Sequence, residues 1–320
     1  MGFLKSLFST GKQNNTEDNN QKNTQKNFEI FKYDGMRAQR IGQIDYAIKC
    51  FKEALNLQKD FETMNYLSQT YIQKGELEPA RELLQQMLEA DPEHIDTYLV
   101  LANVCFVQED YQTMVENARK AIELNKENAT AYYLEGKAEH KLDNDLMSIA
   151  GLTKAIALKS NYTEALLLRA EILLKLKQYQ EASEDIKAIL QENAEDENAL
   201  LLQGELEEAT GKEDEAEKNY LSVTELNPFN EQAYLHLGQL YINQKKLAEA
   251  IELFNEAIDL NPNFAQAYHE RGRAKLLNGD KEGSVEDMKK SLELNPKENE
   301  NLTGKFENLG SKPETIPGIF

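Results

Sequence analysis

The chain repeats itself every 34 residues between Phe61 and Glu298, seven times in succession and without an insertion or deletion. A small residue returns at the same place in each repeat: Ser68, Ala102, Gly136, Ala170, Gly204, Gly238 and Gly272. Gly35 holds this place in an eighth, N-terminal unit, Phe28–Asp60. A fixed period of this length predicts stacked units that pack only on their neighbours, so the 320 residues do not require one large core.

Each unit has the pattern of two amphipathic helices. In the unit Glu231–Phe264, the residues that share one face are Tyr234, Leu237, Gly238 and Tyr241 in the first helix and Ala250, Phe254 and Ala257 in the second. Glycine marks the turn between the helices in four units, at Gly42, Gly75, Gly211 and Gly279. Proline closes four units, at Pro92, Pro228, Pro262 and Pro296, where it cannot continue a helix.

A bulky residue of each second helix corresponds to the small residue of the first. These bulky residues are Phe51, Leu84, Leu152, Ile186, Tyr220, Phe254 and Met288. We expect the small residue to let the second helix approach closely and the bulky one to fill the groove between the helices. In one unit the sizes are exchanged between Met114 and Ala118, which conserves the total volume.

Together, these features resemble the tetratricopeptide repeat family. The match is best in Glu231–Phe264, where Tyr234, Leu237, Gly238, Tyr241, Ala250, Phe254, Ala257 and Pro262 are all of the expected type. The resemblance implies an all-α fold, a right-handed α-solenoid of eight helix-turn-helix repeats whose concave surface holds a peptide segment. The expected units are 28–60, 61–94, 95–128, 129–162, 163–196, 197–230, 231–264 and 265–298.

The chain departs from the family pattern in its middle units. Lys126, Ser160 and Ala194 replace the closing proline, and the chain has no tryptophan. Gly151 lies within the second helix of Ala129–Tyr162, where glycine costs about 0.5–1 kcal/mol relative to alanine. We therefore expect this hairpin to be the least stable of the internal repeats.

Both ends of the chain lie outside the array. Residues 1–27 are predicted to be a disordered tail, because Lys12–Asn27 is rich in Asn, Gln and Lys and has no aliphatic or aromatic residue. Residues 299–320 are predicted to be a C-terminal tail. Within it, Leu302, Phe306 and Leu309 have the spacing of a short helix that would cap the last repeat. Whether this tail caps the array or occupies the groove is left open by the sequence.

Composition limits the partners and the location. The formal net charge is −20, from 36 basic and 56 acidic residues, and an acidic surface repels nucleic-acid phosphates. No apolar run is long enough to span a membrane. Cys50 and Cys105 lie at helical core positions and give no disulfide framework. The expected location is cytoplasmic, and the oligomeric state is not indicated.

The sequence contains no pattern of residues that indicates catalysis. The histidines, at 94, 140, 236 and 269, have no metal-ligand spacing, and no nucleophile elbow, phosphate-binding glycine loop or Cys-x-x-Cys motif is present. We expect no enzyme activity, no cofactor and no metal site. One subtype of the family holds acidic chaperone tails in a Lys and Asn clamp, but beside Lys32 the clamp's Asn is replaced by Met36.

The predicted partner-binding residues lie on the first helices, outside the small and bulky columns. The fifth position of five consecutive units is apolar or aromatic: Leu99, Tyr133, Leu167, Leu201 and Leu235. Four residues further on, Asn103, Lys137 and Gln239 supply polar groups. Such a strip suits a helix or extended segment with apolar anchors. The alternative is that these side chains pack on the adjoining helix.

The sequence thus predicts a non-catalytic scaffold that binds a peptide or helical segment of another protein in its concave groove. An alternative function is a membrane-recruited assembly factor. In that case the short apolar turn of Phe3, Leu4, Leu7 and Phe8 would contact a membrane.

Overall fold

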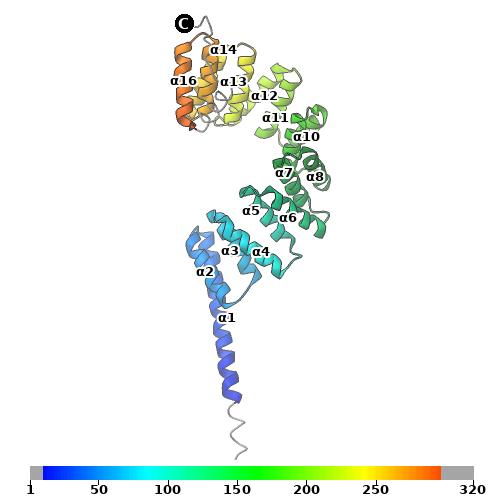
Figure 1. The fold of residues 1–320 in the computed structure, drawn as a ribbon, viewed down its shortest axis with the longest axis vertical. Coiled ribbons are helices and arrows are strands. Elements are labelled where there is room, and N and C mark those ends of the chain that lie inside the picture. The colour runs from blue at the N-terminus through cyan, green and yellow to red at the C-terminus, as the bar shows by residue number, and fades with distance from the viewer. Residues whose placement is uncertain (1–9, 297–320) are drawn as a thin grey trace, which may run out of the picture. The chain divides into compact units, whose positions relative to one another are not determined.

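A computed structural model describes residues 10–296, which form sixteen α-helices and no strands (Figure 1). The chain divides into two compact units, Met1–Ala165 and Leu166–Phe320. No helix in the described range is long and apolar enough to cross a bilayer. The predicted Phe3–Phe8 turn and the C-terminal tail with Leu302, Phe306 and Leu309 lie outside the described residues.

The helices alternate regularly along the chain. The first helices of the hairpins are α1 (Thr10–Arg40), α3 (Phe61–Lys74), α5 (Ile95–Val107), α7 (Ala129–Lys141), α9 (Thr163–Lys175), α11 (Glu197–Ala209), α13 (Glu231–Asn243) and α15 (Ala265–Leu277). The second helices are α2 (Ile44–Leu57), α4 (Leu77–Ala90), α6 (Tyr111–Leu124), α8 (Asp145–Leu158), α10 (Tyr179–Glu192), α12 (Glu213–Leu226), α14 (Leu247–Leu260) and α16 (Lys281–Leu294). From α3 onward, each first helix begins 34 residues after the previous one.

Side-chain oxygens of the turns between hairpins fix where the next helix begins. The Asn230 Oδ1 accepts a hydrogen bond from the backbone N–H of Ala233 at 3.1 Å and so caps α13. Three residues earlier, the Asn227 Oδ1 accepts from the Phe229 N–H at 3.0 Å. Asn125 and Asn193 make the same turn contact in units that lack the closing proline. The asparagine therefore defines these turns without the proline ring.

The close approach of the two helices in a hairpin depends on the small residue that recurs at the same place in each first helix. A Cβ placed on Gly238 would collide with the ring of Phe254, and one on Gly204 would collide with the ring of Tyr220. Phe254 and Tyr220 are fully buried. In the unit with exchanged sizes, Met114 and Ala118 are both fully buried as well. A bulky side chain thus occupies the space that the glycine leaves empty, as the sequence pattern predicts.

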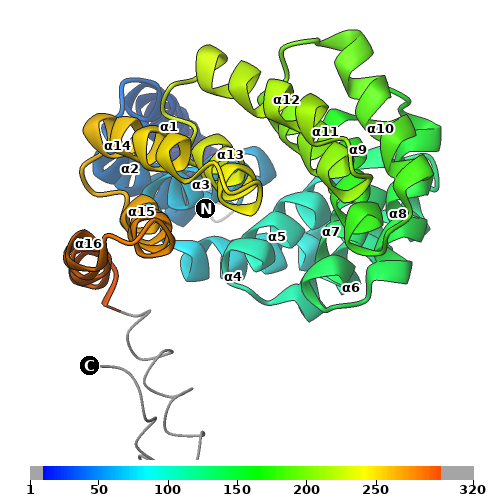
Figure 2. The ribbon, with the colours of Figure 1, turned by 90° about the horizontal axis from the view of Figure 1, so that it is seen from above.

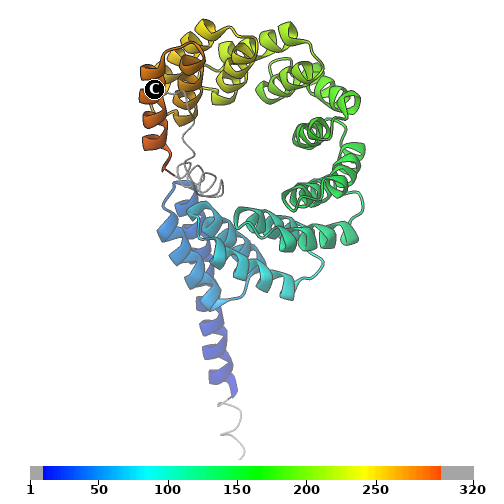
Figure 3. The same cartoon turned by 45° about the horizontal axis from the view of Figure 1, so that its top comes forward.

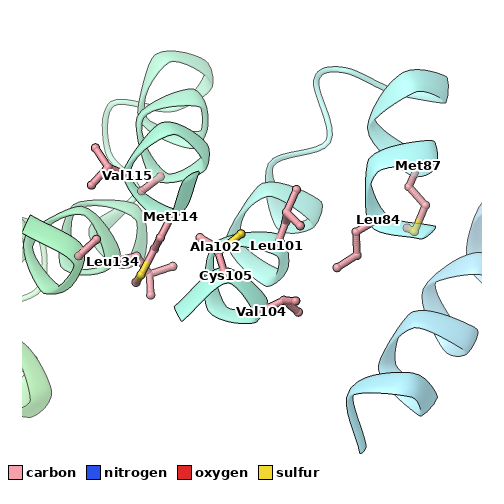
Figure 4. Close-up of a cluster of buried hydrophobic side chains, with 11 residues drawn as sticks. Leu84, Met87, Leu101, Ala102, Val104, Cys105, Met114, Val115 and Leu134 are labelled. Carbon is pink, nitrogen blue, oxygen red and sulfur yellow. The ribbon is translucent and has the colours of Figure 1, made fainter. Parts of the chain in front are cut away.

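The core forms a series of local clusters between successive helices. In the cluster of Figure 4, Leu84 and Met87 of α4 lie beside Leu101 and Cys105 of α5, and side chains of α6 and α7 continue it. Other clusters likewise join neighbouring hairpins within one unit, and one of them joins side chains of α13, α14 and α15. The ribbons of these three helices are labelled in Figure 2. Both cysteines are buried and unpaired.

The predicted disorder of the N-terminal tail is wrong for residues 10–27, because α1 is continuous from Thr10 (Figure 3). No proline interrupts this segment and Phe28–Arg40 is already helical, so each added residue requires only helix propagation. Residues 21–27 are exposed, and Phe28 is the first buried residue among residues 21–296.

Gly151 has a packing role that its helix propensity does not reveal. A Cβ at this position would lie 3.1 Å from the Tyr132 carbonyl oxygen and 3.3 Å from the Gly136 Cα. The backbones of α7 and α8 therefore meet at two glycines, and close contact compensates for the poor helix propensity of Gly151.

Candidate functional site

The first helices of the unit Met1–Ala165 bring four of the predicted residues together. Leu99 and Asn103 lie on α5, and Tyr133 and Lys137 lie on α7, which packs on α5. Asn103 is exposed, and its Nδ2 donates to the Leu99 carbonyl oxygen at 2.9 Å. Leu99 and Tyr133 are half-buried and contact the core cluster of α4–α7. Each of these two side chains thus has one part of its surface packed against the core and another part exposed to solvent.

Lys137 lies on an aromatic surface that sequence reasoning did not assemble. Its Nζ is 3.7 Å from the centroid of the Phe106 ring and 6.0 Å from that of Tyr133. The Tyr133 ring in turn lies 5.1 Å from the ring of Tyr162. We call Phe106, Tyr133, Lys137 and Tyr162 the Lys137 cluster. The one sequence signal was that Phe106 is the only phenylalanine in its column of the first helices.

The ammonium group of Lys137 lacks an acidic partner. No carboxylate pairs with it anywhere in residues 10–296. Burial, and to a smaller extent the charge of Lys141, lower the pKa of Lys137. The aromatic rings offset part of this desolvation through cation–π attraction. A half-buried cation without a counterion is suited to receive an acceptor oxygen from outside.

The first helices of the unit Leu166–Phe320 are arranged differently. Leu201 is 8 % exposed and belongs to the cluster of Tyr220 and Leu237, so little of this predicted partner-binding side chain is open to a partner. This leucine packs on the adjoining helices, which is the alternative interpretation of the fifth-position residues. Leu167 and Leu235 are half-buried, and Leu235 contacts the cluster around Phe254.

The polar residues of this unit bind one another across successive hairpins. The Arg273 Nη1 donates to the Gln239 Oε1 at 2.7 Å, and the Gln239 Nε2 donates to the Asn243 Oδ1 at 2.8 Å. The His236 Nε2 lies 3.3 Å from the Glu205 Oε1. Burial raises the pKa of Glu205, aided by the nearby carboxylates Glu171 and Glu208, and burial lowers the pKa of His236. Gln239 is therefore already engaged within the chain.

Lys32 is engaged in a similar way. It is 8 % exposed, and its Nζ pairs with Asp60 at 3.0 Å and Glu62 at 2.6 Å. Two neighbouring carboxylates occupy the place that an acidic chaperone tail would need. In residues 10–296, no group of three or more His, Cys, Asp and Glu side chains is arranged to hold a metal ion.

Comparisons with known proteins extend these observations. Residues 62–90 match the family described as tetratricopeptide repeat, and residues 148–285 match the family described as tetratricopeptide repeat protein 21 N-terminal ARM repeat. A solved tetratricopeptide repeat protein from Parabacteroides merdae superposes with a TM-score of 0.63 at 22 % identity, covering 73 % of this chain and 93 % of the other. The chain is a tetratricopeptide repeat protein.

Two further solved structures share the fold of this tetratricopeptide repeat protein. PilF of Pseudomonas aeruginosa has a TM-score of 0.57 at 16 % identity, covering 69 % of this chain and 99 % of PilF. Cut9, from the APC/C hetero-tetramer Cut9–Hcn1, has a TM-score of 0.58 at 14 % identity, covering 79 % of this chain and 50 % of the other. No curated protein matches the sequence. The tetratricopeptide repeat fold is generally a scaffold for protein interactions.

Proposed function

We propose that this tetratricopeptide repeat protein is a non-catalytic scaffold that binds a peptide or helical segment of a partner protein on the first-helix face of α5 and α7. The observation that carries the proposal is the Lys137 cluster, a half-buried ammonium group on two aromatic rings with no carboxylate beside it in the described residues. In a chain with 56 acidic side chains, a cation without an acidic partner is notable.

The surroundings of Lys137 define the segment that would fit. Leu99, Tyr133 and Phe106 are each partly exposed, so an apolar side chain of the partner would cover their remaining surface. Lys137 would donate to a carboxylate or a backbone carbonyl of the same segment, and Asn103 would contribute at the exposed edge. Recognition of this kind combines apolar anchors with a few polar contacts.

The unit Leu166–Phe320 offers a more limited surface. Leu167 and Leu235 are half-buried and remain candidate anchors, whereas Leu201 is omitted. Gln239 would join a partner only through the network that it already forms with Arg273. We therefore assign the primary contact to α5 and α7.

Site-specific crosslinking followed by a charge-reversal variant tests this function. A photoreactive residue at Asn103 should capture one short segment of a partner, and the synthetic segment should then bind the purified chain. Asn103→Glu with Lys137→Glu should weaken this binding at least about tenfold, which corresponds to the loss of about 1.4 kcal/mol. Circular dichroism should show unchanged helical content.

A matched control variant distinguishes an effect at the site from an effect of the change in net charge. Gln112→Glu with Lys126→Glu makes the same charge change at two exposed positions, on α6 and in the turn that follows it. Binding should persist in this control. Equal binding by wild type and the Asn103/Lys137 variant would reject the site, and equal loss in both variants would reject its specificity.

A further inference from the structure

A groove with an apolar floor and an acidic rim runs along α14 in the unit Leu166–Phe320. Its volume is about 760 Å3. The apolar lining comes from Tyr241 of α13 and from Ala248, Leu253 and Leu260 of α14. The acidic lining comes from Glu249, Glu252, Glu256 and Asp259, which recur along one side of the helix. The other lining residue is Asn255.

The carboxylates of the groove are largely uncompensated. Glu249, Glu252 and Asp259 are exposed and have no ion pair with any residue of the described chain. Glu256 accepts only a hydrogen bond from the Tyr234 Oη at 3.3 Å. Lys246, whose Nζ lies 5.3 Å from the centroid of the Tyr241 ring, is paired with Glu217 at 3.2 Å. Arg271 donates to the lining residue Asn255 at 2.7 Å, and its guanidinium is paired with Asp287. The groove therefore presents negative charge around apolar surface, and the complementary ligand is a basic amphipathic segment.

The chain itself contains a segment of this chemistry. Residues 1–12 carry the large apolar residues Phe3, Leu4, Leu7 and Phe8 together with Lys5 and Lys12, and the first carboxylate of the sequence is Glu17. The array is strongly acidic. In contrast, this segment combines apolar and basic residues and contains no Asp or Glu. Residues 1–9 lie outside the described structure.

The helix α1 begins at Thr10, and Phe28 is the first buried residue among residues 21–296. The eighteen residues of α1 before Phe28 span roughly 27 Å at 1.5 Å each. The start of α1 therefore lies at about this distance along the helix from the first packed side chain in that range. We propose that residues 1–12 of one copy dock in the α14 groove of a second copy.

This contact would be heterologous, because the segment and the groove are different surfaces of the chain. Heterologous contacts generate rings or open chains of molecules rather than isolated pairs. Because the carboxylates at the rim of the groove are exposed to solvent, the association should weaken as salt is added. The groove would thus serve to assemble copies of the scaffold.

Sedimentation velocity of the full-length chain over a range of concentrations tests the proposal by charge reversal. Lys5→Glu with Lys12→Glu should weaken self-association at least about tenfold, and Glu252→Lys with Asp259→Lys should do the same, since two exposed pairs together contribute about one factor of ten. The four substitutions combined should restore association. Glu181→Lys with Glu184→Lys, at exposed positions of α10, makes the same charge change outside the groove and should leave association intact.

Several results would overturn the proposal. A wild-type chain that stays monomeric at all concentrations removes it, as does an association that the groove substitutions leave unchanged. Failure of the combined variant to associate, or equal loss in the α10 control, would show that net charge rather than docking is responsible. Binding of the wild-type chain to anionic phosphatidylserine vesicles without self-association would assign residues 1–12 to a membrane surface instead.

Discussion

The turn inside each described hairpin places one residue in the left-handed region of backbone conformation. Glycine holds this place four times, with φ between 76° and 92°, while Glu109, Asp143, Lys177 and Lys245 hold it in the other hairpins with φ between 59° and 62°. An L-residue with a side chain is strained here by roughly 1–2 kcal/mol. The sequence marked four of these turns through glycine and gave no sign of the other four.

Exchange of residues at this turn position should change stability in opposite directions. Gly75→Ala should cost about 1 kcal/mol, and because a Cβ at Gly75 meets no atom within 4 Å, the backbone angle alone would be responsible. Lys245→Gly should stabilise by up to about 1 kcal/mol through relief of the same strain. Thermal unfolding measures both effects. The adjacent Gln244→Gly, at φ −76°, is the control and should bring no gain.

A buried ion pair in the last hairpin couples stability to pH. The Arg271 Nε and Nη2 donate to the two carboxylate oxygens of Asp287 at 2.8 and 2.6 Å, and the Lys275 Nζ lies 2.8 Å from the Oδ2. Burial by itself would raise the pKa of Asp287, but the hydrogen bonds from Arg271 and Lys275 outweigh burial and lower the pKa. This carboxylate therefore stabilises the fold in its ionised form.

Asp287→Asn should destabilise the α15–α16 hairpin by about 2–4 kcal/mol at pH 7, since it removes the buried carboxylate that pairs with two partly buried cations. A lowered folded-state pKa gives stability that is present above the ordinary pKa of about 3.9 and is lost as the pH falls through the folded-state value. The difference between wild type and variant should therefore shrink below about pH 3.9. Denaturant unfolding at pH 7 and at pH 3 measures this. A difference that is independent of pH would contradict the assignment, and Asp214→Asn, at an exposed position, is the control.

At the scale of the helices, glycines at the contact between two helices determine how closely the helices approach. Gly136 of α7 and Gly151 of α8 face each other, and a Cβ at Gly136 would lie 2.9 Å from the Leu152 Cγ. From helix propensity alone, Gly151→Ala would be a stabilising change. The contact between the two backbones reverses this expectation.

Gly151→Ala should destabilise the α7–α8 hairpin by about 1–2 kcal/mol, because the added methyl group must displace a packed helix. Hydrogen exchange of the α7 and α8 amides reports on this hairpin directly. Ala150→Gly, at the exposed neighbouring position, should cost about 1 kcal/mol by propensity alone. Slower exchange in the Gly151→Ala chain would show that propensity outweighs packing.

The helices could be predicted from the sequence because every unit repeats the same arrangement of small and bulky residues at a fixed period. Small and bulky columns such as Gly238 and Phe254 specify both the helices and their pairing, and the structure agrees with them. The asparagine turns were not predicted, because Asn125 and Asn193 do not look special until their hydrogen bonds are known. The helix from Thr10 to Asn27 was missed because the segment has no apolar residue that would give a helical pattern, while the helix that begins there continues into the first hairpin.

The candidate site was predictable only in part. The fifth and ninth positions selected residues that lie together on α5 and α7, but exposure along a column varies with the neighbours in each unit. Leu201 is covered by its cluster, whereas Leu99 and Tyr133 stay partly open. The Lys137 cluster also depends on Phe106 of the preceding hairpin, and a contact across hairpins cannot be read from one column.

At the scale of the whole molecule, stability is local. The helices in substantial contact within the described chain are neighbours or next neighbours in order, and the clusters of buried side chains join only successive hairpins. In such an array, stability is approximately a sum of terms for each repeat and each interface. A defect in one hairpin should then lower protection near that hairpin and leave distant hairpins unaffected.

Phe254→Ala tests this directly, because the ring is fully buried against Gly238 and its loss costs about 3–5 kcal/mol. Amides of α13–α16 that exchange by local opening should exchange about 100- to 4,000-fold faster, as each 1.4 kcal/mol corresponds to a factor of ten. Amides of α2–α6 should keep their wild-type rates within a factor of about two, because the helices in substantial contact with α14 are α13 and α15. Hydrogen exchange measured by mass spectrometry distinguishes the two regions in one experiment. Equal acceleration in both would mean that the array unfolds as a single cooperative body, and the additive description of its repeats would then fail.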